Sequence, residues 1–92
     1  MDTLVDVLKR LGITNKGSFA RNGSYVIDIE DSDEFGKIYS ILDKNPDLEY
    51  MENNSLLTID NGSLYYLYDR KYQINLIADF KNDNYKLVAT EV

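Results

Sequence analysis

The residues best suited to chemistry are carboxylates, and five of them fall within seven positions near the middle of the chain. They are Asp28, Glu30, Asp31, Asp33 and Glu34. Carboxylates this close together can bind a cation, exchange a proton as an acid and base pair, or offer a negative patch to a basic partner. They also have an ordinary structural use, because aspartate caps helices and acidic residues in a first turn complement the helix dipole.

Calcium binding is not expected from either acidic stretch of the sequence. The common calcium-binding loop has ligands at alternate positions, a glycine at the sixth and a glutamate at the twelfth. After Asp31 and Asp33, the third ligand position is occupied by Phe35. In the stretch 79–83, Lys81 stands where a ligand belongs. We therefore expect no metal at these carboxylates.

Tyrosine is the second conspicuous feature, with eight in the chain and a group at Tyr65, Tyr66 and Tyr68. Neighbouring strand residues point to opposite faces, so Tyr65 and Tyr66 cannot both be buried under a sheet covered on one side. Tyrosine is common at half-buried strand positions and is also enriched at protein interfaces. Two interpretations stay open: ordinary strand residues, or a recognition surface formed by Tyr65, Tyr66 and Tyr68.

The groups that most enzymes use for catalysis are absent from the sequence. It contains no histidine and no cysteine, which removes imidazole bases, thiol nucleophiles and the common triads. It also has no glycine-rich phosphate loop and no G-x-S-x-G elbow. Two carboxylates could still hydrolyse a glycosidic bond, but a chain of 92 residues rarely encloses a pocket for that reaction. We expect a protein without enzymatic activity and without a cofactor.

Negative charge is concentrated in the middle of the chain. Between positions 28 and 60, ten acidic residues stand against two lysines, a charge of −8, whereas the whole chain carries −6. Direct binding to nucleic acid requires a basic surface and is not expected. The lack of cysteine suits a reducing compartment, and the sequence has no apolar run of membrane-spanning length. Because Asp2 follows Met1 where a signal peptide would have basic residues, we expect no export signal. The expected location is the cytoplasm.

The carboxylate cluster lies where an expected strand meets an expected helix. Residues 24–30 alternate between apolar and polar, and they follow Asn22–Gly23, which is typical of a two-residue type I′ hairpin turn. Asp31 or Ser32 can cap the helix that follows, and Asn45–Pro46 ends it. The cluster is thus predicted to be held by two rigid elements.

The remaining elements complete an α+β pattern over a single domain, residues 1–92. A first helix is predicted from a cap at Thr3 to a stop at Gly12, and a weaker strand around Phe19. The other strands are predicted at 48–51, 56–59, 64–68, 72–80 and 85–92, with a second hairpin turn at Asn61–Gly62. The order α-β-β-α-β-β-β-β-β, joined by tight turns, predicts a twisted antiparallel sheet with both helices on one face.

In length, acidity and the cluster from Asp28 to Glu34, the chain resembles the small acidic inhibitors of phages and mobile elements, anti-CRISPR proteins among them. The resemblance implies a cytoplasmic phage protein that acts as a DNA mimic on a basic protein partner, such as a Cas effector or another nuclease. Two alternative functions are also consistent with the sequence. One is an immunity protein or antitoxin against a toxic nuclease. The other is an assembly protein that self-associates through a sheet edge or the tyrosine face, for instance as a homodimer.

Overall fold

The computed structural model describes residues 3–50 and 61–92 of the chain. Its two helices are α1 (Leu4–Leu11) and α2 (Ser32–Lys44). The strands among the described residues are β1 (Ser18–Phe19), β2 (Tyr25–Ile29), β3 (Leu48–Tyr50), β4 (Asn61–Tyr68), β5 (Tyr72–Asp79) and β6 (Asn84–Glu91).

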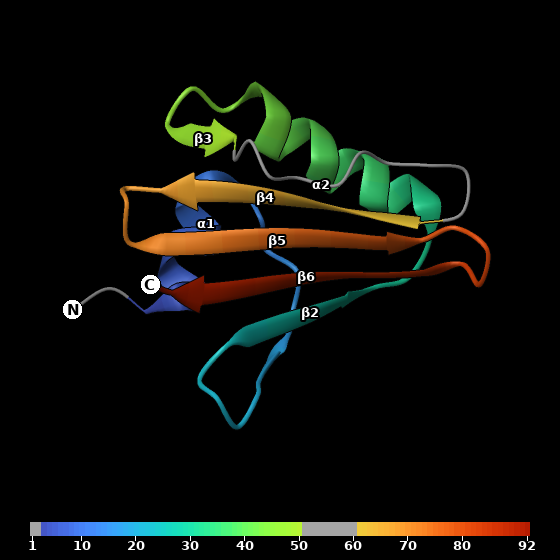
Figure 1. Ribbon diagram of the computed structural model, residues 1–92, viewed down its shortest axis with the longest axis horizontal. Helices are drawn as coiled ribbons and strands as arrows, with labels where there is room; N and C mark the ends of the chain where they lie inside the picture. Colours follow the sequence, from blue (N-terminus) through green and yellow to red (C-terminus); the bar gives the residue numbers. More distant parts are fainter. Residues whose placement is uncertain (1–2, 51–60) are drawn as a thin grey trace.

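These strands form one antiparallel sheet in the order β1-β2-β6-β5-β4-β3. In Figure 1, α1 lies behind the sheet and α2 runs along β4, partly behind it. The predicted α+β class is confirmed. The neighbours β4, β5 and β6 follow one another in sequence, whereas β2 joins the sheet beside the last strand. The predicted strand at 56–59 lies outside the described residues.

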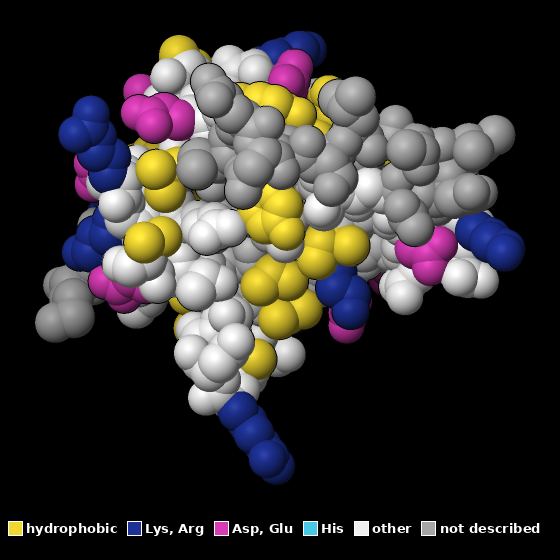
Figure 2. All heavy atoms as spheres, in the orientation of Figure 1, with side chains coloured by type: hydrophobic (Ala, Val, Ile, Leu, Met, Phe, Trp, Pro, Cys, Tyr) yellow, Lys and Arg dark blue, Asp and Glu magenta, His cyan; other side chains and the backbone are white. Residues whose placement is uncertain are grey.

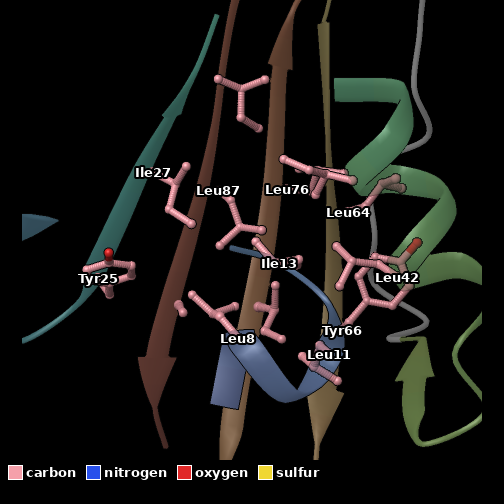
Figure 3. Close-up of a cluster of buried hydrophobic side chains, with 14 of the residues drawn as sticks. Leu8, Leu11, Ile13, Tyr25, Ile27, Leu42, Leu64, Tyr66, Leu76 and Leu87 are labelled. Carbon is pink, nitrogen blue, oxygen red and sulfur yellow. The ribbon is translucent and has the colours of Figure 1, made fainter. Parts of the chain in front are cut away.

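The core lies between the sheet and the two helices, because apolar residues alternate along the strands and recur along one side of each helix. In β5, Tyr72, Ile74, Leu76 and Ala78 are buried and the residues between them are half-buried. Leu8 and Leu11 of α1 and Leu42 of α2 point toward the same face of the sheet (Figure 3). Alternate strand residues are buried on one face, and neither of the two described helices covers the opposite face of the sheet.

The ends of both helices follow the local sequence signals. Thr3 and Asp6 form the predicted capping box at the start of α1, and Gly12 ends that helix in the left-handed conformation, with φ 98°. Asp31, rather than Ser32, caps α2, because its Oδ1 accepts a 2.8 Å hydrogen bond from the backbone N–H of Glu34. Asn45 ends α2 immediately before Pro46, as predicted.

The turn at Asn22–Gly23 differs from the predicted type I′ turn. Gly23 has φ 89°, but Asn22 does not have the positive φ that a type I′ turn needs. The Gly23 N–H donates to the Ala20 carbonyl at 3.0 Å, and the Ala20 N–H donates to the Ser24 carbonyl at 2.8 Å. The connection is therefore a three-residue turn with a single left-handed glycine at its end, a common alternative for hairpins.

The second predicted hairpin turn, Asn61–Gly62, is wrong, because both residues belong to β4. Asn61 lies opposite Asp79 and Gly62 lies opposite Ala78. The type I′ geometry occurs instead at Asp69–Arg70, with φ values of 55° and 54° and a 3.1 Å hydrogen bond from the Lys71 N–H to the Tyr68 carbonyl. The register between β4 and β5 imposes this conformation on residues that rarely adopt it.

Candidate functional site

Four of the five predicted carboxylates surround one open hollow of about 390 Å³, which we call the acidic hollow. Its lining consists of Asn15, Lys16, Asp28, Glu30, Asp31 and Glu34. Asp28 belongs to β2, Glu30 to the link that follows, and Asp31 and Glu34 to the start of α2. Asp33 is exposed on α2 but does not line the hollow. The strand-to-helix junction thus gathers most of the cluster, as expected.

Two of these carboxylates also hold the structure together. Asp31 caps α2 with one oxygen, and Glu34 Oε1 accepts a 2.8 Å hydrogen bond from the side-chain amide of Asn15. The second contact joins the connection after α1 to the first turn of α2. The capping interpretation of the cluster is therefore correct for Asp31. It does not exclude a binding role, because a carboxylate has a second oxygen and several lone-pair sites.

Charge in the acidic hollow is unbalanced. Of the described residues, four carboxylates line it, and Lys16 contributes the one ammonium group. Asp28, Glu30 and Asp31 are exposed, and Glu34 is half-buried. Negative groups that share a concave surface reinforce one another's potential and attract cations or basic side chains from a distance. Within the described parts of the chain, however, no three acidic side chains are arranged to hold a metal ion.

Sequence reasoning did not single out Asn15 and Lys16. They lie in the connection between α1 and β1, which no motif marks, and they meet the acidic residues only through the tertiary fold. The same two residues also border a second hollow of about 330 Å³, whose lining includes the apolar side chains of Val5, Leu8 and Ile13. Asn15 and Lys16 therefore separate an acidic hollow from a more apolar one.

The three tyrosines do not form one surface. Tyr66 is only 2% exposed and faces the core, where its ring lies 5.5 Å from that of Tyr50. Tyr68 shares that face and packs against Tyr72, with ring centroids 6.3 Å apart. Tyr65 is half-buried on the opposite face of the sheet. The predicted recognition surface is thus corrected: alternation along β4 sends Tyr66 into the core and away from any partner.

Burial gives Tyr66 unusual properties within the core. Its hydroxyl has no hydrogen-bond partner among residues 3–50 and 61–92. Burial, followed by the nearby Asp43 carboxylate, raises the pKa of Tyr66 to about 12. A buried hydroxyl without a partner costs stability, and the neutral form is favoured because ionisation would place a charge away from water. Nothing here resembles an activated phenolate, which would need a lowered pKa.

The face of the sheet turned away from the helices carries an apolar area, which Figure 2 shows as yellow side chains near its centre. Its half-buried apolar residues include Val26, Val88 and Ile77, which are neighbours on β2, β6 and β5, and Leu67, which lies farther along the sheet opposite Gln73. Val26 and Val88 lie opposite each other in the register of β2 and β6. Apolar residues grouped on an uncovered sheet face are typical of contact surfaces between proteins.

Comparisons of the chain with protein-family models, with curated proteins and with solved structures find no significant match. In the described residues, neither helix has the length and apolar character needed to cross a membrane.

Proposed function

We propose that this chain is a non-enzymatic binding protein that presents its acidic hollow to a basic partner, and that the partner is a protein that handles nucleic acid. One observation carries the proposal: Asp28, Glu30, Asp31 and Glu34 line a single open hollow, and among the described lining residues only Lys16 opposes their charge. β2 carries Asp28 and the first turn of α2 carries Glu34, while Glu30 and Asp31 lie in the short link between these elements. Preorganised charge of this kind steers a partner and fixes its orientation.

The chemistry of nucleic-acid-binding proteins makes them suitable targets. A nuclease or Cas effector must keep a positive groove for phosphates, and carboxylates spaced on a rigid sheet can occupy that groove instead. The chain would then act in the cytoplasm as an inhibitor of the anti-CRISPR type, without binding nucleic acid itself. An immunity protein or antitoxin would use the same surface against a toxic nuclease.

The test compares two double variants that each remove two negative charges. Asp28→Asn with Glu30→Gln alters the acidic hollow, whereas Asp47→Asn with Glu49→Gln removes the same charge from exposed positions elsewhere. Both are assayed for binding to, and inhibition of, purified basic nucleases at low and high salt. We expect the first variant to lose about tenfold in affinity at low salt and the second to lose little. Equal losses would show that only overall charge matters and would refute a localised site.

Self-association is a second candidate, favoured by the apolar area on the uncovered sheet face. Val26, Leu67, Ile77 and Val88 would be buried between two copies packed face to face. Light scattering over a range of protein concentrations tests this: a dimer should form at high concentration, and Val88→Lys should prevent it. A wild-type chain that stays monomeric throughout would remove this candidate.

A further inference from the structure

The outer edge of β2 is only partly covered. The two-residue strand β1 pairs with Tyr25 and Val26 alone, and Gly17, just before β1, packs closely against Val26 and Ile27. No other described strand lies beside Asp28 and Ile29 on that side. Figure 1 shows the β1 hairpin at one end of β2, whereas no strand is drawn on the outer side of its other end, which leads into α2. The free edge of a strand presents backbone N–H and C=O groups that can pair with another chain.

The register between β1 and β2 shows which residue of β2 presents backbone N–H and C=O groups at the free edge. The Ala20 N–H donates to the Ser24 carbonyl, and Ser18 lies opposite Val26, so residues 24 and 26 turn their backbone groups toward β1. Backbone groups alternate between the two sides of a strand, which places the N–H and C=O of Asp28 on the same outer side. Asp28 therefore provides one donor and one acceptor just beyond the point where β1 ends.

The charges beside this edge define what could pair with it. The edge borders the acidic hollow, since Asp28 and Glu30 line the hollow. A strand added here would project alternate side chains to each side of the sheet, within reach of these carboxylates. An acidic or neutral strand would gain little from them, whereas lysine or arginine side chains would form charge-assisted hydrogen bonds.

We propose that an extended basic segment of the partner protein adds as a strand to the free edge of β2 beside Asp28, with its cationic side chains in the acidic hollow. The inference rests on the proposed function and specifies how the partner is held. Main-chain pairing at Asp28 sets the direction and register of the segment, while the carboxylates select its charge. Lys16, at the border of the hollow, limits how many cationic side chains it takes.

The probes are capped synthetic nonapeptides that alternate lysine with threonine. One peptide is unmodified. In the second, the backbone nitrogen of every lysine is methylated, and in the third, the backbone nitrogen of every threonine. Methylation removes those backbone N–H donors without changing the charge of the peptide. Because one set of N–H groups faces β2 and the other faces away, strand addition predicts that one methylated peptide binds like the unmodified one. The other should bind about tenfold more weakly. Amide chemical shifts of Ile27–Glu30 should report the binding.

Variants of the protein give a second readout. Asp28→Pro removes the outward N–H, which the fold itself does not use for pairing with β6, and Asp28→Asn is the matched control that removes the charge but keeps that N–H. We expect Asp28→Pro to bind the unmodified peptide several-fold more weakly than Asp28→Asn does. If Asp28→Pro does not fold, the methylated peptides decide the question alone.

The outcomes separate the two proposals. If both methylated peptides bind as well as the unmodified one, strand addition is refuted while charge recognition by the acidic hollow stands. If an alternating glutamate and threonine peptide binds equally well, charge recognition is refuted too. Failure of all peptides to bind at millimolar concentration also overturns strand addition, and the charge-removal variants assayed on nucleases then test the acidic hollow separately.

Discussion

The side-chain amide of Asn15 donates a 2.8 Å hydrogen bond to Glu34 Oε1 and thereby ties the connection after α1 to the first turn of α2. These residues are 19 positions apart in the sequence and come from elements that no strand pairing joins. The bond is part-buried and holds one wall of the acidic hollow against the other. The Asn15–Glu34 hydrogen bond therefore fixes both the shape of the acidic hollow and the position of one of its negative charges.

Replacing Asn15 with alanine should lower the free energy of unfolding by about 1 kcal/mol, since it leaves a part-buried carboxylate with one partner fewer. Lys16→Ala is the matched control, because Lys16 is the exposed neighbour on the same connection and its loss should change stability by less than about 0.5 kcal/mol. Urea unfolding followed by circular dichroism measures both. Equal stabilities for the two variants would mean that the Asn15–Glu34 bond is not formed in solution.

Gly17 and Gly36 should respond in opposite ways to alanine. A Cβ at Gly17 would lie 2.3 Å from the Val26 carbonyl oxygen, where β1 comes against β2, so the backbone must move. We expect a loss of about 2–3 kcal/mol, typical of forced overpacking. A Cβ at Gly36 meets nothing within 4 Å on the exposed side of α2, and alanine there should add about 0.5–1 kcal/mol. Thermal unfolding of the two variants gives the comparison; a stabilised Gly17→Ala would contradict the close approach.

The turn at Asp69–Arg70 offers a stabilising change. Both residues have positive φ, which costs an ordinary side chain about 1 kcal/mol or more relative to glycine. Arg70→Gly should therefore raise the free energy of unfolding by about 1 kcal/mol. Lys71→Gly, the next position along, does not have positive φ and should not stabilise the protein. Denaturant midpoints distinguish the two, and no gain in Arg70→Gly would argue against the left-handed turn.

The features that could be predicted from the sequence are those that depend on interactions between residues close together in the chain. The cap at Thr3, the stop at Gly12 and the end of α2 before Pro46 depend on neighbours within a few residues, and each was predicted correctly. The alternation that buries Ile74 and Leu76 is likewise visible in a single strand. The α+β class followed because two amphipathic helices and several alternating strands have few other ways to cover their apolar surfaces.

The missed features depend on contacts between distant parts of the chain. Asn61–Gly62 carries a strong hairpin signal, yet pairing with β5 keeps both residues in β4. The same pairing forces Asp69–Arg70 into a type I′ turn, although these two residue types do not predict that turn. The share of Asn15 in the candidate site could not be read from the sequence, because its partner Glu34 lies in another element.

Tyr66 should make stability depend on alkaline pH. Its pKa is about 12 in the folded protein against an ordinary value of 10.0, so the unfolded chain loses the proton first as pH rises. Stability is then constant below about pH 10 and falls between about pH 10 and 12, by about 2–3 kcal/mol for a shift of this size. Tyr66→Phe should remove most of this fall and, because it deletes a buried hydroxyl without a partner, should not destabilise the protein at pH 7.

Unfolding free energies of wild type and Tyr66→Phe across pH 8 to 12 provide the test. A residual fall in the variant is expected from Tyr85, whose pKa is raised first by burial and then by its hydrogen bond with Asp83. Identical alkaline profiles for the two proteins would mean that the Tyr66 hydroxyl is solvated or has found a partner in solution.

Asp31 allows its two roles, helix cap and acidic binding group, to be separated by experiment. Serine also caps helices well but carries no charge, so Asp31→Ser should keep stability within about 0.5 kcal/mol, whereas Asp31→Ala should lose about 1 kcal/mol with the cap. If Asp31 also contacts a basic partner, both variants should weaken salt-sensitive binding equally, because both remove the same negative charge. The experiment measures binding to one purified basic nuclease together with denaturant unfolding. Binding that tracks stability instead of charge, with Asp31→Ser behaving as wild type in both assays, would leave Asp31 with a capping role alone.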